Sequence, residues 1–191
     1  MNILVVAAHP DDEVLGMGGT IKKLTKNKNR VKIVIMATGI AARRSTNYQN
    51  STRYNITEND QKTIKKQIMT VKSHAKKAAK LLGVTDIEFL DFPDNEMDTI
   101  SNLELTKSVE HIIQKFKPEI VYTHTPFDVN VDHVCCYNAV LTATRPKKKT
   151  IVKKLLSFEV PSSTEWNFTS VFTPNIFVDI SKELSSKIKA L

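Results

Sequence analysis

The stretch Ile3-Leu4-Val5-Val6-Ala7-Ala8-His9-Pro10-Asp11-Asp12-Glu13 decides the fold, because six apolar residues run directly into a histidine and three acids. An apolar run of this length, ended by His-Pro, is typical of a β-strand that is buried on both faces. Such strands belong to parallel sheets with helices on both sides. The stretch therefore predicts an α/β protein.

The rest of the chain alternates apolar runs with helix-like segments. We expect strands at residues 31–37, 87–90 and 119–123 and helices at residues 14–26, 59–82, 101–117 and 133–144. In the last third, residues 154–160 and 176–180 resemble strands, and Ser181 is expected to cap a terminal helix. The pattern predicts a three-layer, Rossmann-like, mostly parallel sheet in a single domain over residues 1–191. The chain ends in a helix-like segment, which leaves open a trimmed chain or a short protein.

The composition is that of a soluble globular protein, with 41% hydrophobic and 25% charged residues, and it excludes a disordered chain. The 28 Lys and Arg outnumber the 20 Asp and Glu, so the net charge is +8. This excess suits an anionic substrate, a phosphate or a nucleic acid, but lysines dispersed along residues 62–80 favour a solvated surface. We expect a small-molecule substrate and no nucleic-acid partner, and we leave a homo-oligomer open.

The cysteines and the apolar runs indicate the compartment. Cys135 and Cys136 are adjacent, and adjacent residues rarely form a disulfide, so a reducing cytoplasm is the expected location. No apolar run approaches the roughly 18–20 residues of a membrane span. Residues 2–8 lack the basic start and the length of a signal peptide.

Polar clusters follow the expected strands at the end where ligands gather in parallel sheets, at residues 9–13, 91–95 and 124–133. An acid in a first helical turn favours the helix dipole, but that explains neither His9 nor a second cluster that ends in Asp132-His133. Imidazole and carboxylate together suit a hydrolytic zinc ion with three protein ligands and a water. His9 and Asp12 can face one ion from the same turn, and His133 can complete the set. Asp11, beside a ligand, is the best candidate for the general base.

At these residues the sequence resembles the LmbE/PIG-L family of zinc-dependent N-deacetylases. The block at residues 9–13 and the distant Asp132-His133 pair carry the resemblance, with weaker matches at Gly16, Gly18-Gly19 and residues 78–84, 92–95 and 117–121. The resemblance implies a Rossmann-like sheet and removal of an acetyl group from an N-acetylated amino sugar or sugar conjugate. It also implies that His9, Asp12 and His133 are the zinc ligands, that Asp11 is the general base and that Asp132 orients the site.

One position departs from the family pattern. Many members carry a histidine two residues before the Asp of the Asp-His pair, and here that residue is Asn130. An amide donates a hydrogen bond to an oxyanion but cannot deliver a proton at neutral pH. Two alternatives stay open: His124 takes over the acid role, or protonated Asp11 returns its proton to the amine. The departure resembles a branch associated with bacterial surface-polysaccharide pathways.

Several polar residues are candidates for substrate binding, each with a structural alternative. The candidates are Arg43, Arg44 and Arg53 in the loop after the second strand, Asp94 and Asn95 after the third, and Arg145 near the end of a helix. The arginines can grip a diphosphate, and the Asp-Asn pair can bind sugar hydroxyls. A solvated loop, an ordinary turn and a helix-dipole contact explain them equally well. For Trp166 we expect core packing rather than sugar stacking, and for the cysteines small buried apolar roles.

The sequence therefore predicts a zinc hydrolase acting on an N-acetylhexosamine-type substrate, nucleotide- and lipid-linked forms included. Fe(II) is an alternative to zinc because the ligand set suits either ion. Two rival hypotheses are an amidase acting on a non-sugar acylated amine and a catalytically silent module that binds a metal and an anion. Asp11 argues against the silent module, and Asn130 keeps it open.

Overall fold

The computed structural model describes residues 1–38, 58–146 and 151–191. Arg43, Arg44 and Arg53 lie outside these ranges, so their role stays a prediction. In the described part, no helix is both long enough and apolar enough to cross a membrane.

A five-stranded sheet forms the centre of the fold, and all of its strand pairs are parallel. The strands are β1 (Asn2–Ala7), β2 (Arg30–Ala37), β3 (Asp86–Phe92), β4 (Ile120–Thr123) and β5 (Lys154–Ser157), in the order β3-β2-β1-β4-β5. β1 lies in the middle, and its residues 3–7 are fully buried. The predicted buried strand and parallel sheet are thus confirmed.

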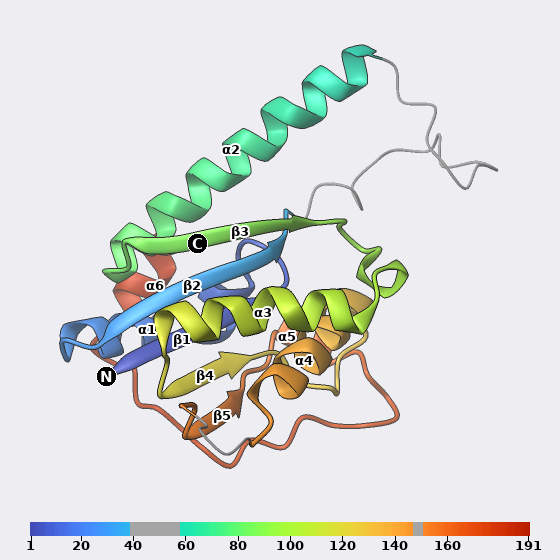
Figure 1. The fold of residues 1–191 in the computed structure, drawn as a ribbon. Helices are drawn as coiled ribbons and strands as arrows, with labels where there is room; N and C mark the ends of the chain where they lie inside the picture. Colours follow the sequence, from blue (N-terminus) through green and yellow to red (C-terminus); the bar gives the residue numbers. More distant parts are fainter. Residues whose placement is uncertain (39–57, 147–150) are drawn as a thin grey trace.

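Helices cover both faces of the sheet (Figure 1). The helices are α1 (Asp12–Lys26), α2 (Glu58–Leu82), α3 (Asn102–Phe116), α4 (Val131–Thr144), α5 (Pro161–Thr164) and α6 (Leu184–Ala190), with a 3-10 turn η2 at Met97–Thr99. Side chains alternate along β1: Leu4 and Val6 pack with α3 and α4, whereas Ile3 and Val5 pack with α1 and α2. This two-sided core confirms the three-layer, Rossmann-like prediction.

The strand order reverses at β1, which pairs with β2 on one side and with β4 on the other. In doubly wound sheets the crevice at such a switch point, beyond the carboxyl ends of the strands, is where ligands bind. Here His9 lies two residues after the end of β1, and His124 follows β4 directly. The topology therefore brings the two polar clusters of the sequence to one place.

The predicted start and end of α3 are confirmed, because both depend on contacts between residues close together in the sequence. Ser101 caps α3, and its hydroxyl accepts the N–H of Glu104 at 3.2 Å. The helix ends at Phe116, and its C-cap Lys117 adopts a left-handed conformation with φ 52° directly before Pro118. Proline disfavours helical backbone at the residue before it, which accounts for this boundary.

Three predictions for the C-terminal third were wrong. Residues 176–180 form no strand, because Ile180 packs against α1 at Gly19 and no described strand pairs with the segment. Ser181 does not cap α6, which begins after Glu183; its hydroxyl donates to the Asp179 carboxylate instead. Trp166 is 64% exposed rather than in the core. The first error concerns a segment whose conformation depends on a partner distant in the sequence, since Gly19 lies about 160 residues from Ile180.

Candidate metal centre

A tight turn between β1 and α1 brings His9 and Asp12 together. Asp11 has φ 109°, and its carbonyl accepts the N–H groups of Val14 and Leu15, which starts α1. The backbone N–H of His9 donates to Asp12 Oδ2 at 2.8 Å. The turn therefore holds the Asp12 carboxylate directly beside the His9 ring.

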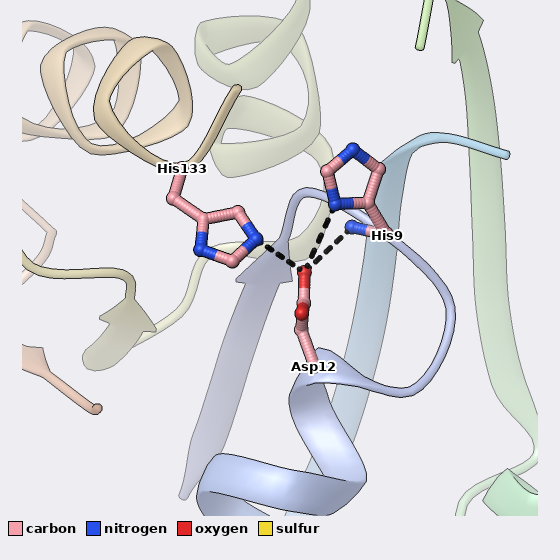
Figure 2. Close-up of side chains that lie close together, drawn as sticks. All are labelled: His9, Asp12 and His133. Carbon is pink, nitrogen blue, oxygen red and sulfur yellow. Dashed lines mark hydrogen bonds and ion pairs between the residues drawn. The ribbon is translucent and has the colours of Figure 1, made fainter. Parts of the chain in front are cut away.

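His133 completes a cluster of three buried side chains (Figure 2). Asp12 Oδ2 lies 3.5 Å from His9 Nδ1 and 3.2 Å from His133 Nε2. One ligand atom from each residue lies within 4.8 Å of the other two. Ligand atoms about 2 Å from one tetrahedral zinc ion are about 3.3 Å apart, so the three groups are close to the spacing that the ion needs. The structure thus brings together the three predicted ligands.

The far nitrogen of each ring is held by another carboxylate. His9 Nε2 lies 2.9 Å from Asp132 Oδ2, and His133 Nδ1 lies 2.8 Å from Asp128 Oδ2. Ionised carboxylates only accept hydrogen bonds, so we assign the ring protons to these two nitrogens. When the rings are neutral, as metal ligands are, the lone pairs of the other two nitrogens face Asp12. Carboxylates that fix histidine tautomers in this way accompany metal ligands in proteins, so the residues fit a divalent cation.

The electrostatics of the cluster favour positive charge at its centre. Burial lowers the pKa of His9, but hydrogen bonds to Asp12 and Asp132 outweigh that effect and raise it to about 11. The same balance, with Asp12 and Asp128 as partners, raises the pKa of His133 to about 9. Burial raises the Asp12 pKa, but the histidines outweigh it and hold that pKa well below its usual range. A bound cation would take the place of the two imidazolium protons.

Asp132 connects the His9 ring to the loop after β3. Its fully buried carboxylate accepts the backbone N–H groups of Asn95 at 2.6 Å and Met97 at 3.1 Å. Asp94 is also buried, with Oδ1 3.2 Å from His9 Nε2, whereas Asn95 is exposed. Of this predicted sugar-binding pair, Asp94 therefore faces the His9 ring, and Asn95 lies at the surface.

His124 is fully buried and stacks against the His133 ring. The two rings stack with centroids 4.0 Å apart, and the N–H of Ala8 donates to His124 Nε2 at 2.9 Å. Burial lowers the pKa of His124 to about 3, so the ring is neutral. Its proton therefore sits on Nδ1, which has no hydrogen-bond partner among the described residues.

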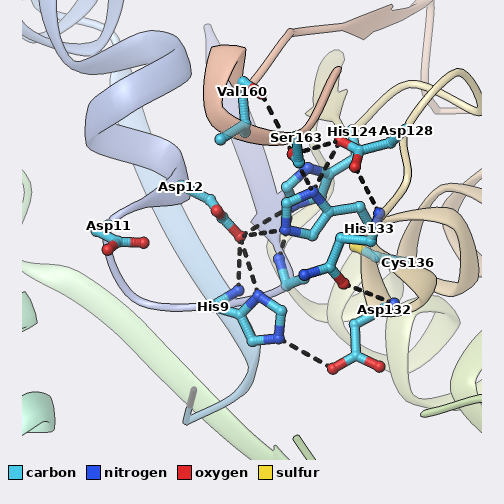
Figure 3. A network of polar contacts seen from close by, with 12 residues as sticks. His9, Asp11, Asp12, His124, Asp128, Asp132, His133, Cys136, Val160 and Ser163 are labelled. Atoms are coloured by element: carbon cyan, nitrogen blue, oxygen red, sulfur yellow. Dashed lines mark hydrogen bonds and ion pairs between the residues drawn. The ribbon is translucent and has the colours of Figure 1, made fainter. Parts of the chain in front are cut away.

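Asn130 and Asp11, the other two residues predicted to act in the reaction, lie at the edge of the cluster rather than at its centre. Asn130 precedes α4, and its side-chain oxygen accepts the N–H of Asp132 at 2.9 Å. Asp11 is exposed, and Figure 3 draws its carboxylate apart from the contacts that join the three ligands. Arg145 follows the C-terminal end of α4, about 18 Å of helix away from His133, so the structure does not bring it to the cluster.

The sequence reasoning assigned no role to Asp128 or Ser163. Ser163, in α5, donates its hydroxyl hydrogen to Asp128 Oδ2 at 3.0 Å and lies 3.4 Å from His133 Nδ1 (Figure 3). Asp128 lies five residues before His133 in the same polar run, and this proximity is a usable signal. Nothing in the sequence around Ser163 points to the cluster.

Glu13, the last acid of the first motif, is fully buried beside the turn. One of its oxygens accepts the N–H of Asp11 at 3.2 Å, and the other has no hydrogen-bond partner among the described residues. Burial raises the pKa of Glu13 to about 8, so the side chain is mostly protonated at neutral pH. Its place indicates support of the turn rather than metal binding.

Comparison with known proteins agrees with this geometry. The family model described as PIG-L, GlcNAc-PI de-N-acetylase, matches residues 4–144. Diacetylchitobiose deacetylase of Thermococcus kodakarensis is 28% identical over 99% of this chain and 67% of its own length. A probable N-acetyl-α-D-glucosaminyl L-malate deacetylase of Bacillus anthracis is 23% identical over all of this chain and 78% of its own length.

A solved structure of an enzyme that is named a hydratase shares this fold. The 4-carboxy-2-hydroxymuconate hydratase of Pseudomonas putida superposes with a TM-score of 0.76 at 21% identity, over 99% of this chain and 76% of its own. A likeness at this identity shows the fold alone, so the reaction has to be argued from the site. The family model, however, spans most of the chain and includes His9, Asp12 and His133, and the chain therefore belongs to the PIG-L family.

Proposed function

We propose that this protein is a zinc-dependent hydrolase that removes the acetyl group from an N-acetylated amino sugar or sugar conjugate. One observation carries the proposal: Asp12 Oδ2 faces one nitrogen of each of two imidazoles, and the other nitrogens are held by Asp132 and Asp128. Membership in a family of de-N-acetylases supports the reaction class.

His9, Asp12 and His133 would hold the ion. A zinc ion bound there supplies a Lewis acid that polarises the amide carbonyl and lowers the pKa of a water molecule toward about 7. Fe(II) is a second candidate, because nitrogen and oxygen ligands suit both ions. Asp132 and Asp128 hold the two rings in the orientation that leaves the inner lone pairs available.

Asp11 is the proposed general base, since it is an exposed carboxylate next to a ligand. Asn130 is the proposed donor to the oxyanion: its side-chain oxygen is engaged by Asp132 N–H, which leaves its NH₂ group as the donor. For the proton that the amine needs, we favour Asp11 over His124. The neutral His124 ring already uses its Nε2 lone pair to accept from Ala8, and its burial opposes the cationic form.

The relatives indicate the type of substrate. Their names describe deacetylation of diacetylchitobiose and of an N-acetylglucosaminyl malate, so we propose an N-acetylglucosamine-type conjugate, sugar-nucleotide and lipid-linked forms included. Asn95 at the rim remains a proposed contact for sugar hydroxyls, and Arg145 remains a more remote candidate. Free thiols at Cys135 and Cys136 support the cytoplasm as the compartment.

Acetate release tests the proposal. The zinc-loaded protein is incubated with diacetylchitobiose, N-acetylglucosaminyl malate, a nucleotide-linked N-acetylglucosamine and an N-acetylated non-sugar amine. We expect acetate from at least one sugar and from none of the samples treated with a chelator. Release from the non-sugar amine alone would refute the sugar substrate. No release from any of them, with zinc bound at one ion per chain, would favour a silent module.

Two variants separate the proton donors. Asp11→Asn is expected to lower turnover by at least about 100-fold, whereas His124→Ala, assayed at full zinc content, should retain a much larger share. A loss in His124→Ala as large as in Asp11→Asn, at equal zinc content, would return the acid role to His124.

A further inference from the structure

From Lys62 to Lys80, the outer face of α2 carries lysines and no acids. Its exposed lysines are Lys62, Lys65, Lys66, Lys76, Lys77 and Lys80, and residues 62–80 contain no Asp or Glu. In the described part of the chain, the ion pair that the structure gives to this helix joins the half-buried Lys72 to Asp91. Among the side chains that the structure describes, the six exposed lysines, which we call the lysine face, therefore form a strip of positive charge without an acidic partner.

Helix geometry puts these lysines on one side. At 100° per residue, the apolar residues of α2 fall on a stripe whose C-terminal part is buried against the body, and the lysine face lies opposite that stripe. The apolar residues are Ile64, Ile68, Val71, Ala75, Ala78, Ala79 and Leu82. From Lys62 to Lys80 the lysine face extends about 27 Å along the helix axis. The charge is therefore arranged as a nearly straight row rather than as a pocket.

The amino-terminal half of α2 projects away from the sheet (Figure 1). Helix contacts of α2 are with α1 and α6. α2 ends at Leu82, four residues before β3 begins at Asp86, and β3 runs parallel to β2 and β1. The carboxyl-terminal end of α2 therefore lies at the amino end of the strands, and its amino-terminal end lies toward the carboxyl edge, where the candidate metal centre is. The amino-terminal lysines therefore project from the side of the molecule that carries the candidate site.

The lysine face is complementary in charge and shape to an extended anionic surface rather than to a single small anion. Lysine ammoniums are point charges without the fork with which arginine grips one phosphate, and the row contains no arginine. It also contains no aromatic side chain on which a nucleic-acid base would stack. A bilayer with acidic headgroups offers many mobile negative charges in one plane, and basic segments near it each gain affinity.

We propose that the lysine face of α2 docks this protein on an anionic lipid bilayer as a peripheral protein. Docking requires no membrane span, and it would hold the candidate site next to the membrane surface. The inference goes beyond the proposed function and does not depend on it, because vesicle binding is measured without turnover.

Sedimentation with lipid vesicles tests the proposal. The full chain is mixed with vesicles of phosphatidylcholine alone or with about 30% phosphatidylglycerol, over a series of salt concentrations. We expect binding to the anionic vesicles only, with loss of binding as salt rises. The variant Lys62→Gln/Lys65→Gln/Lys66→Gln should bind about 100-fold more weakly, at about fivefold per lysine. Glutamine keeps the helix propensity of the segment.

A matched control separates the lysine face from net charge. Lys115→Gln/Lys154→Gln/Lys182→Gln removes the same charge from exposed lysines on other elements and should bind nearly as well as the original protein. Equal losses in the two variants would overturn the proposal, as would no binding to the anionic vesicles. Tighter binding to a single-stranded oligonucleotide than to the vesicles would also overturn it. Circular dichroism and zinc content confirm that each variant is folded.

Discussion

The two halves of the candidate metal centre have the same arrangement of groups but are supported differently. Each half has an imidazole whose inner nitrogen faces Asp12 and whose outer nitrogen meets a carboxylate, Asp132 for His9 and Asp128 for His133. Asp132 is oriented by two backbone N–H groups from the loop after β3. Asp128 is oriented by the hydroxyl of Ser163 and by one backbone N–H, that of Asn130.

This difference shows that His9 and His133 are supported by different parts of the chain. Backbone donors are fixed by the fold and cannot reverse their polarity, so the His9 half depends on the loop that follows β3. A hydroxyl can rotate and can both donate and accept, so the His133 half has an adaptable partner in the C-terminal segment. We therefore expect substitutions in the two halves to have unequal effects.

The largest effect is expected at Asp12, which both halves share. Asp12→Asn removes the charge at the meeting point of the two imidazoles, so it should lower zinc content strongly and lower acetate release by at least about 1000-fold. Elemental analysis and the acetate assay measure both. Asp98→Asn, an exposed acid on η2, is the control. Full zinc content and turnover in Asp12→Asn would exclude this centre.

A pH series on the metal-free protein tests the two imidazoles together. Their pKa values in the folded protein, about 11 for His9 and about 9 for His133, lie above the ordinary 6.5. Their contribution to stability is therefore complete below pH 6.5 and is lost as the pH rises through these values. Between pH 7 and 9 each imidazole should contribute a loss of about 2 kcal/mol, so the free energy of unfolding should fall by about 4–5 kcal/mol.

Urea unfolding in the presence of a chelator measures this fall. The zinc-loaded protein should show a much smaller one over the same range, because its ligand nitrogens carry no proton to lose. A metal-free protein whose stability does not change between pH 7 and 9 would contradict the charge balance described for the cluster.

The two outer carboxylates test the halves separately. In Asp132→Asn, either orientation of the amide places its NH₂ against a backbone N–H, so we expect about a 100-fold loss of zinc affinity. In Asp128→Asn the NH₂ also meets a donor in either orientation, the Asn130 N–H or the His133 Nδ1–H. The Ser163 hydroxyl, however, can turn to accept from the NH₂, so we expect a smaller loss of about 10-fold. Competition with a fluorescent zinc chelator measures both. A larger loss in Asp128→Asn would reverse the comparison.

The smallest effect is expected at Ser163. Ser163→Ala removes one hydrogen bond to Asp128, and we expect zinc affinity to weaken by about 3–10-fold with little change in the KM of the zinc-saturated enzyme. Ser162→Ala, an exposed neighbour on α5, should behave like the original protein. If the two variants are indistinguishable in zinc affinity, Ser163 does not support the His133 half.

Local patterns in the sequence were enough for the architecture. The apolar run of β1, the alternation of strands and helices and the Ser101 cap depend on residues close together in the chain, and the structure confirms them. The residue types in the two polar motifs also indicated which side chains would meet. The roles of Asp11, His124 and Asn130 in the reaction remain predictions, because they depend on where a substrate lies.

The sequence by itself therefore determined the sheet, its helices and the three side chains, predicted as ligands, that the fold brings together. Only the tertiary structure decided that Asp132 supports His9, that Ser163 reaches Asp128, and that residues 176–180 pack against α1 instead of joining the sheet. The physical reason is range: helix caps and apolar periodicity act within a few residues, whereas a strand or a buried carboxylate needs a partner that the fold alone brings within hydrogen-bond distance.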